Sequence, residues 1–381
     1  MDKKRRVSDT GPAEAASLRA MITGYELVQA IYVAAKLGIA DLLADGPRAC
    51  GDLAKATETD EGGLYRTLRA LAGAGVFADL GSRRFGLTPL ARHLQAAVPG
   101  SLRAVALLAG ERSYRAWGGL LHSVKTGQTA FEHVFGMGTF EYMAQNPDLA
   151  EIYNDAMTAA SVERAAAVVR AYDFSAFRTI VDVGGGHGTL LAAILQAHPA
   201  LQGIVLERPS VVPGAQQYLE RAGLAARGRV LACDFFRSIP GASDACLLSH
   251  IIHNWDDSRS EAILKNCRAA MPSTGRLLLV EKVMPERVEA SGAMQRTLMA
   301  DLHMMVITGG RERTETEYEA LFASAGFRLS RVIRTQAGES IIEGLPGLTA
   351  TGGAGRRRAG PGGRRLDIRV STRSLRRHAQ R

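Results

Sequence analysis

The sequence has few cysteines and no long apolar run. Its four cysteines are Cys50, Cys233, Cys246 and Cys267. They lie far apart and form no C-x-x-C pair, so neither a disulfide framework nor a cysteine zinc site is indicated. No run of about 18 apolar residues is present, and the charged start of the chain is not followed by the apolar core of a signal peptide. These absences predict a cytoplasmic protein with reduced cysteines and no membrane partner.

Most of the chain also lacks net charge. The formal charge is +9, but residues 346–381 contain ten Arg, no Lys and a single acid, so this tail holds the whole excess. The neutral body gives no electrostatic reason to expect a specific nucleic-acid partner. The tail is dominated by Gly, Arg and Pro, which predicts disorder over 346–381, and the polar stretch 1–17 predicts a disordered lead.

Residues 18–98 predict a winged-helix dimerisation domain. The segment from Leu18 to Leu43 is helical in pattern and apolar over most of its circumference, which indicates burial against another subunit. Helical patterns at 52–56 and 60–74 precede two strand patterns at 76–80 and 85–87, an order typical of a winged helix. Such a domain can bind DNA or serve only as a dimerisation scaffold. The candidate recognition helix opens with Asp60 and Glu61, which phosphates would repel, so we favour the scaffold.

The rest of the chain predicts a helical segment followed by an α/β domain. Residues 99–172 are mostly helical in pattern and rich in aromatic residues and Met, side chains suited to a pocket for a planar aromatic ligand. Strand and helix patterns alternate over 173–345, which predicts a doubly wound, Rossmann-like parallel sheet with the cofactor site.

A glycine-rich turn opens this α/β domain. The stretch Thr179–Leu191 reads as strand, tight turn and helix, and glycines let a ligand lie against the main chain in such a turn. Gly184, Gly186 and Gly188 follow Asp182 in a G-x-G-x-G register. A dinucleotide fingerprint would need its third glycine where Thr189 stands. The spacing resembles motif I of class I S-adenosylmethionine-dependent methyltransferases.

The next two predicted strands end in residues suited to a nucleoside. Ligands of doubly wound sheets sit at the carboxyl ends of the strands. Glu207 ends the second strand, where a carboxylate can accept both ribose hydroxyls. Asp234 and Phe235 end the third, and they offer an acid for an adenine amino group and a ring for its face. The three strand ends together predict a nucleoside-containing cofactor.

Two histidines, His250 and His253, follow the fourth predicted strand. Ser258 and Glu261 have the spacing of a capping box, so the histidines lie in the connection before the next helix. A histidine there can take a proton near neutral pH, or it can be a satisfied core imidazole. Zinc needs more ligands than two histidines, and no cysteine or acid is grouped with them in the sequence, so we expect no metal.

Several motifs together resemble the caffeate/flavonoid-type O-methyltransferase family, including its bacterial natural-product members. The most specific are H-x-W-x-D at His253–Asp257 and G-G-x-E-R-T at Gly309–Thr314, and the resemblance extends over roughly Met21 to Leu345. It implies S-adenosyl-L-methionine as cofactor and a homodimer. It also implies methyl transfer to a phenolic or enolic hydroxyl of a small aromatic or polyketide-like metabolite, as in antibiotic biosynthesis.

The resemblance also implies roles for individual residues. It makes His253 the general base, with Glu312 and Glu281 beside its imidazole. The implied cofactor contacts are Asp182, Gly184, Gly186, Gly188, Glu207, Asp234, Phe235, Ser249 and Ser161. The implied substrate contacts are Tyr153, Met157, His303 and Met304. Ser249 stands where the family often has Lys, and Glu207 and Asn254 stand where Asp is common.

Two other functions stay open at this stage. Some relatives use the same fold and cofactor for decarboxylation or hydroxylation, and the presence of His253 with both acids favours methyl transfer over these. A winged-helix regulator with a ligand-sensing α/β domain is the alternative from another class, and the neutral body charge opposes it.

Overall fold

The computed structural model describes residues 11–240 and 243–347. Residues 1–10 of the expected lead and 348–381 of the expected tail therefore lie outside the described residues. Helix α1 (Pro12–Ile22) starts inside the stretch that was expected to be disordered up to residue 17. Its first residue is a proline, which suits the start of a helix because its fixed φ is already helical and its missing N–H has no helical partner there.

The single helix expected from Leu18 to Leu43 is three helices. Helix α1 ends at Ile22, the Thr23 hydroxyl that follows it donates to the Arg19 carbonyl, and α2 (Gly24–Lys36) comes next. Gly38 has a φ of 65°, a left-handed conformation that glycine adopts without steric cost, and it separates α2 from α3 (Ile39–Leu42). The apolar pattern continued through both breaks, so periodicity alone did not show them.

The rest of the N-terminal segment has the helices and strands that the sequence predicts, with one addition. Helices α4 (Cys50–Ala56) and α5 (Glu61–Gly73) precede strands β2 (Phe77–Asp79) and β3 (Arg84–Leu87). A short strand, β1 (Arg48–Ala49), pairs antiparallel with β3 and completes a sheet of order β1-β3-β2. The sequence did not reveal β1 because two residues are too few for a strand pattern.

A run of helices leads to the α/β part. It comprises α6 (Pro89–Arg92), α7 (Arg103–Leu108), the π-helical turn η1 (Ala109–Ser113), α8 (Tyr114–Trp117), α9 (Leu120–Thr126), α10 (Ala130–Phe135), α11 (Thr139–Gln145) and α12 (Pro147–Ala171). Within the described residues, no helix has both the length and the hydropathy that a membrane crossing requires.

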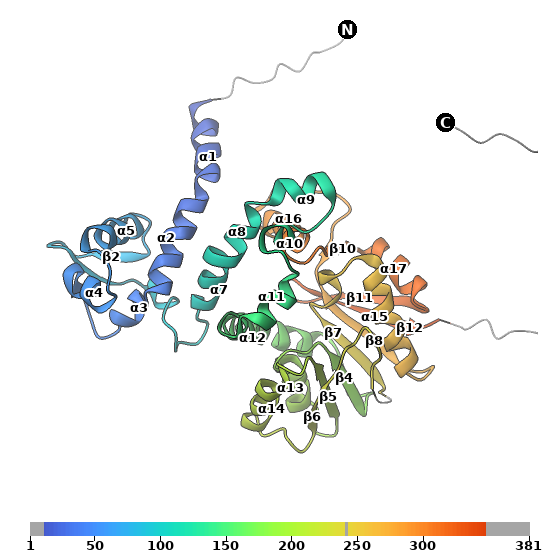
Figure 1. Ribbon diagram of the computed structural model, residues 1–381. Coiled ribbons are helices and arrows are strands. Elements are labelled where there is room, and N and C mark those ends of the chain that lie inside the picture. Colours follow the sequence, from blue (N-terminus) through green and yellow to red (C-terminus); the bar gives the residue numbers. More distant parts are fainter. Residues whose placement is uncertain (1–10, 241–242, 348–381) are drawn as a thin grey trace, which may run out of the picture. The chain divides into compact units, whose positions relative to one another are not determined.

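The α/β part is built on a seven-stranded sheet of order β11-β12-β8-β7-β4-β5-β6 (Figure 1). Its strands are β4 (Thr179–Val183), β5 (Gln202–Glu207), β6 (Gly228–Ala232), β7 (Ala245–Ser249), β8 (Arg276–Glu281), β11 (Phe327–Arg334) and β12 (Ser340–Pro346). The α/β fold class is confirmed, but the sheet is not wholly parallel. Strand β12 runs antiparallel to both β8 and β11, because the short turn between β11 and β12 allows only a hairpin.

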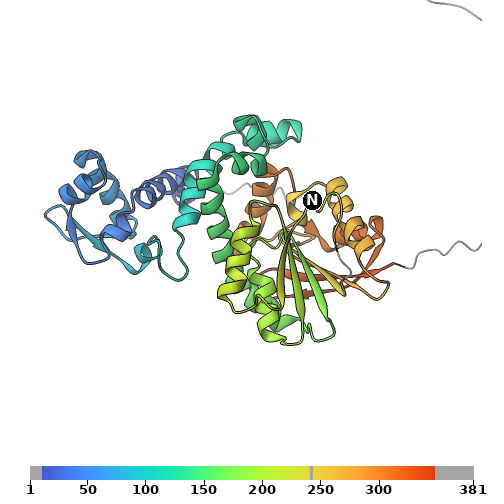
Figure 2. The same cartoon turned by 60° about the horizontal axis from the view of Figure 1, so that its bottom comes forward.

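Helices cover both faces of this sheet (Figures 1 and 2). They are α13 (Thr189–Ala197), α14 (Val212–Arg221), α15 (Asp257–Ala270) and α17 (Glu315–Ser324). Helix α16 (Gly292–Ile307) instead packs against α8, α9 and α10. Residues of α12, α13 and α14 share one apolar core with Ile180 of β4, whereas those of α15 and α17 share the other core with Val181. Burial on both faces explains why the central strands are apolar runs without alternation.

Two short elements complete the connections near the fourth strand. The 3₁₀ turn η2 (Ile252–Asn254) follows β7. Strands β9 (Val283–Met284) and β10 (Arg313–Thr314) pair in parallel and tie the segment after β8 to the segment before α17.

Candidate active site

The glycine turn after β4 forms the floor of a cavity of about 650 Å³. Gly184 and Gly186 line it with φ values of 69° and 59°. A Cβ on Gly184 would lie 2.6 Å from Ile251 Cδ1, so a side chain there would both strain the backbone and collide with Ile251. Gly188 has a φ of 81° and is the residue before α13, and it does not line the cavity.

Two carboxylates close one side of this cavity. Glu207 at the end of β5 accepts hydrogen bonds from the main-chain N–H groups of Gly186, at 3.3 Å, and Arg208, at 2.7 Å. Asp182 is 1% exposed, and neither of its oxygens has a hydrogen-bond partner among the described residues. Burial, with a smaller contribution from Glu207, raises the pKa of Asp182 to about 7. An unpartnered carboxylate at a cavity wall suits a cationic ligand group.

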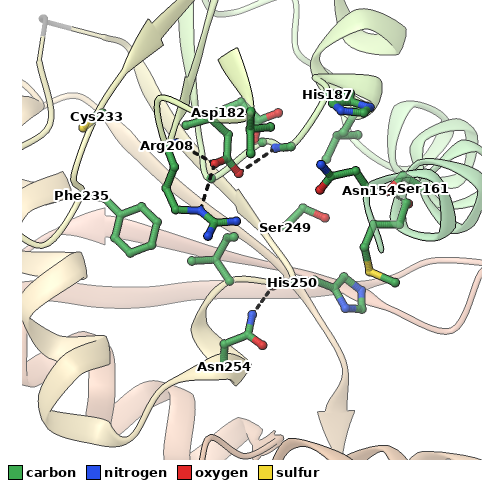
Figure 3. A pocket seen from close by; sticks show the side chains of 18 of the residues that line it. Asn154, Ser161, Asp182, His187, Arg208, Cys233, Phe235, Ser249, His250 and Asn254 are labelled. Carbon is green, nitrogen blue, oxygen red and sulfur yellow. Dashed lines mark hydrogen bonds and ion pairs between the residues drawn. The ribbon is translucent and has the colours of Figure 1, made fainter. Parts of the chain in front are cut away.

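The remaining cofactor candidates also line this cavity, and Figure 3 shows Asp182, Phe235 and Ser249 among them. Asp234 keeps a largely exposed side chain and forms an ion pair with Arg237. The Ser161 hydroxyl donates to the Met157 carbonyl within α12. The sequence did not single out several residues of the same wall, because their types carry no motif of their own: Asn154, Thr158, Arg164 and His187.

His253 is buried in η2 next to two carboxylates. Its Nδ1 lies 3.0 Å from Glu312 Oε1 and 3.5 Å from Glu281 Oε2. No hydrogen bond among the described residues uses its Nε2. Burial lowers the pKa of His253, but the charges of Glu281 and Glu312 outweigh burial and the net shift is upward. The three residues that the resemblance grouped are thus brought together, from η2, from the end of β8 and from the loop before β10.

The two carboxylates differ in their partners. Glu281 is fully buried at the end of β8 and accepts main-chain hydrogen bonds from Ile251 and Ile252, at 3.0 and 2.9 Å. Burial nevertheless raises its pKa to about 7. Burial is the largest influence on the pKa of Glu312 and acts upward, but the hydrogen bond with His253 and the charges of His253, His250 and Lys282 together outweigh it, and the net shift is downward. Glu312 is therefore the carboxylate that remains ionised against the imidazole.

The G-G-x-E-R-T motif explains how this loop is held against η2. A Cβ on Gly310 would lie 2.0 Å from the main-chain oxygen of His253, so only glycine allows the loop to approach this closely. Arg313 has no exposed side chain and donates from Nε and Nη2 to Asp257 Oδ1, at 3.0 and 2.8 Å. It also donates to the carbonyls of Ile252 and Trp255 on either side of His253. The resemblance included this motif, but the positioning role of Arg313 became evident only from these contacts.

A second cavity, of about 560 Å³, is lined by His253 and shares His250 and Asn254 with the first. It is lined by all four of the expected substrate contacts, Tyr153, Met157, His303 and Met304. The Trp117 indole donates to His303 Nδ1 at 3.1 Å. Burial, with smaller contributions from the charges of Arg112 and His253, lowers the pKa of His303 to about 4, so its imidazole is neutral at ordinary pH.

The histidine pair has more acidic neighbours than the sequence indicated. Ligand atoms of His250, His253 and Glu281 lie within 4.8 Å of one another, so the expectation that no acid is grouped with the two histidines was wrong. The fold creates this group by placing the end of β8 beside the end of β7. The same ring atoms already face carboxylates, because His250 Nε2 lies 3.3 Å from Glu339 Oε1 and His253 Nδ1 faces Glu312.

The first cavity fits the cofactor that the sequence predicts. S-adenosyl-L-methionine has a ribose diol, an adenine ring and an ammonium group. Glu207 offers a carboxylate, Phe235 an aromatic ring, and Asp182 a buried carboxylate without a partner. The glycine floor leaves open space at Gly186, where nothing lies within 4 Å of an added Cβ.

Comparisons with known proteins agree with this geometry. The model of the O-methyltransferase domain matches residues 117–328, and that of the O-methyltransferase dimerisation domain matches residues 20–96. A phenazine O-methyltransferase of Lysobacter antibioticus is 46% identical over 326 residues, which cover 86% of this chain and 94% of that protein. A phenazine-1-carboxylate N-methyltransferase of Pseudomonas aeruginosa is 31% identical over 86% of this chain and 96% of its own length.

A solved structure of the same kind contains the demethylated cofactor. It is the crystal structure of an O-methyltransferase from neocarzinostatin biosynthesis in complex with S-adenosyl-L-homocysteine and 1,4-dihydroxy-2-naphthoic acid. It matches with a TM-score of 0.77 at 31% identity, over 86% of this chain and 98% of that one.

Proposed function

The chain belongs to the O-methyltransferase family and is an S-adenosylmethionine-dependent methyltransferase, and we propose that its acceptor is a phenolic or enolic hydroxyl of a small aromatic or polyketide-like metabolite. The observation that carries this proposal is the buried His253, whose Nδ1 is held by two carboxylates while its Nε2 has no partner among the described residues. That arrangement suits a base that removes one proton from a hydroxyl in the second cavity.

In this proposal the protein positions the acceptor and takes its proton. S-adenosyl-L-methionine supplies a methyl group that its sulfonium already activates. His253 accepts the hydroxyl proton on Nε2. Glu312 and Glu281 hold Nδ1 in one tautomer and stabilise the imidazolium that forms. The apolar walls of the second cavity keep a planar ring aligned, which turns the reaction into an oriented, effectively intramolecular step.

We assign the cofactor to the first cavity. Glu207 would accept from the ribose hydroxyls, Asp234 and Phe235 would take the adenine, and Asp182 would face the ammonium group. Gly184 and Gly186 would let the cofactor lie against the main chain, and Gly188 would shape the turn into α13. Ser249 and Ser161 would complete the wall with hydroxyl contacts. On the acceptor side, Tyr153, Met157, His303 and Met304 would contact the substrate.

The direct test replaces His253 by Ala and measures methyl transfer to candidate phenols from cofactor with a labelled methyl group. We expect a loss of about a hundredfold or more, because a positioned general base contributes about that much. Binding of S-adenosyl-L-homocysteine should be unchanged, since Glu207 and Asp182 remain. The exposed His93 provides a matched His→Ala control. Unchanged turnover in the His253 variant would remove this residue from the mechanism.

The product distinguishes the proposed reaction from its alternatives. Mass spectrometry separates gain of a CH₂ unit from gain of an oxygen atom or loss of CO₂, the outcomes of hydroxylation and decarboxylation. The similarity to an N-methyltransferase makes a ring nitrogen the other possible acceptor. Methylation of a compound without any hydroxyl would favour nitrogen over oxygen.

The organisation around this site completes the proposal. Helices α1 and α2 carry exposed apolar side chains, including Met21 and Ile22 at 68% and 65% exposure, and the chain has the family's dimerisation domain, so we infer a homodimer. An Ile22→Asp variant should shift the mass measured by light scattering from dimer to monomer. We divide the chain into a lead (1–17), a dimerisation domain (18–98), a pocket and linker segment (99–172), a catalytic domain (173–345) and a tail (346–381). Four free cysteines suit a reducing cytoplasm.

A further inference from the structure

The second cavity contains a buried positive charge that the proposed mechanism does not use. Arg112 lies in η1 and is only 5% exposed. Within the described residues it forms no ion pair with any carboxylate, and its Nε has no hydrogen-bond partner. Burying an ionised group without a counter-charge costs free energy, so a protein rarely retains one without a further partner.

The contacts that Arg112 does make are weak and neutral. Its Nη1 lies 3.3 Å from the Thr139 hydroxyl and 3.5 Å from the Met143 sulfur. Its guanidinium carbon lies 5.4 Å from the centre of the Tyr153 ring and 5.9 Å from that of Phe131. Burial lowers the pKa of Arg112, and among the described residues Tyr153 and Tyr142, but no carboxylate, oppose this shift. Aromatic faces partly compensate a cation, but they do not satisfy its donors.

The fold places this residue through an unusual local structure. The helix widens to a π-helical turn between α7 and α8. Such turns are rare in proteins, and those that occur are often found at functional sites. The turn is fixed against α2, because Gln29 donates to the Gly110 carbonyl at 2.8 Å and a Cβ on Gly110 would lie 2.1 Å from Tyr32 Cβ. Arg112 is therefore held at the cavity wall by packing on its outer side.

Arg112 and the proposed base belong to the same cavity. Arg112 and His253 both line the second cavity, and the charge of each lowers the pKa of His303, which lines it too. Two other cations line the cavity. Arg164 is already paired with Glu339 at 3.4 Å, and Lys282 is only half-buried. Among the arginine and lysine side chains that line this cavity, Arg112 is the one that is buried and has no carboxylate partner within the described residues.

We propose that the acceptor carries a carboxylate on its aromatic ring and that Arg112 binds this carboxylate while the ring hydroxyl faces His253. A guanidinium offers parallel N–H donors that match the two oxygens of a carboxylate. The bound carboxylate would also be the negative partner that Arg112 lacks among the described residues. The substrate class is then a hydroxylated, planar arene carboxylic acid. This assignment deepens the proposed function and rests on the second cavity being the acceptor site.

The test compares binding of acids with binding of their neutral amides to the full chain saturated with S-adenosyl-L-homocysteine. Suitable pairs are 3-hydroxy-2-naphthoic acid, 1,4-dihydroxy-2-naphthoic acid and 3-amino-4-hydroxybenzoic acid, each with its carboxamide. The fluorescence of Trp117 reports occupancy because its indole lines the cavity and contacts His303. At least one acid should bind the unmodified protein about ten- to a hundredfold more tightly than its amide, the preference expected for a hydrogen-bonded charge pair.

The variants decide whether Arg112 causes that preference. Arg112→Met should bind acid and amide equally, and Arg112→Lys should keep part of the preference. The exposed Arg115 gives a matched Arg115→Met control that should keep all of it, and Lys282→Met should keep it too. Unchanged affinity for S-adenosyl-L-homocysteine shows that each variant is folded. A preference that survives in Arg112→Met, amides that bind as well as acids, or no acid that binds would each overturn the proposal.

Failure of the carboxylate assignment can be distinguished from failure of the proposed O-methylation. If phenols are methylated but no acid binds more tightly than its amide, the carboxylate assignment fails and O-methylation stands. If acids bind through Arg112 but lose CO₂ or gain oxygen, the carboxylate assignment stands and O-methylation fails.

Discussion

Replacing Glu312 by Gln should shift the pH dependence of methyl transfer in a known direction. An imidazole acts as a base only while it is neutral, so kcat/KM of the unmodified enzyme falls as the pH drops through the pKa of His253. Burial lowers this pKa, but Glu281 and Glu312 raise it overall above its ordinary value. Removing the charge of Glu312 lowers it again, and the fall in activity then moves to lower pH.

The geometry sets the size of this shift. Glu312 Oε1 lies 3.0 Å from Nδ1 with both side chains buried, and an opposite charge at such a distance moves a pKa by about 1 to 3 units. Glu281 Oε2 remains at 3.5 Å and retains part of the effect, so we expect a shift of about one unit. The weaker base and the less stabilised imidazolium should also reduce the rate on the alkaline plateau, by about tenfold or more.

Two measurements check this prediction. The first is kcat/KM against pH for the Glu312→Gln enzyme, with Glu319→Gln on the exposed surface of α17 as a matched control. The second is the titration of the His253 ring by ¹⁵N NMR, with the signal assigned by its loss in His253→Ala, which requires no substrate. An acid limb that stays in place or moves to higher pH would refute the assignment of Glu312 as the ionised partner of the base.

Three further predictions follow from single features. Gly310→Ala should lower the melting temperature and reduce methyl transfer by about a hundredfold, because its Cβ would lie 2.0 Å from the His253 carbonyl oxygen. The matched control is Gly24→Ala, because nothing lies within 4 Å of a Cβ at Gly24. Equal effects of the two substitutions would contradict the argument. Affinity for S-adenosyl-L-homocysteine should fall about tenfold between about pH 8 and pH 6, because Asp182, with its pKa of about 7, becomes protonated. The Asp182→Asn variant should bind weakly at both pH values, which calorimetry measures. If binding by this variant still depends on pH, a group other than Asp182 causes the effect. A chain that ends at Gly347 should keep full activity and melting temperature, because β12 ends at Pro346. It should lose any salt-sensitive adhesion to DNA in a filter-binding assay. Loss of activity would show that the Arg-rich segment contributes to the site.

The residues that we assign to the cofactor could be named from the sequence because their chemistry is local. Glycines, Glu207 and the Asp234-Phe235 pair each follow a strand, and parallel strands bring their carboxyl ends together at one edge of the sheet. The prediction failed where register and chain reversal decide the outcome. Strand β12 inserts antiparallel between β8 and β11, although its apolar pattern is the same as that of a parallel strand.

The acceptor side was less accessible from the sequence. His253 and Glu312 are 59 residues apart, and the resemblance alone paired them. The reason for their proximity is the close approach of Gly310 to the His253 main chain and the buried Arg313, which binds the carbonyls on both sides of His253. Nothing in the residue types around Arg112 distinguished it from an ordinary surface arginine.

The sequence by itself therefore determined the fold class, the cofactor and the family, because glycine spacing, strand ends and short motifs are written in consecutive residues. Tertiary structure decided which charges meet. It placed Glu312 against His253, grouped Glu281 with the histidine pair, and buried Arg112 without a carboxylate. The physical reason is that the pKa of a side chain and the need of a charge for a partner depend on burial and distance, and only the folded chain fixes these quantities.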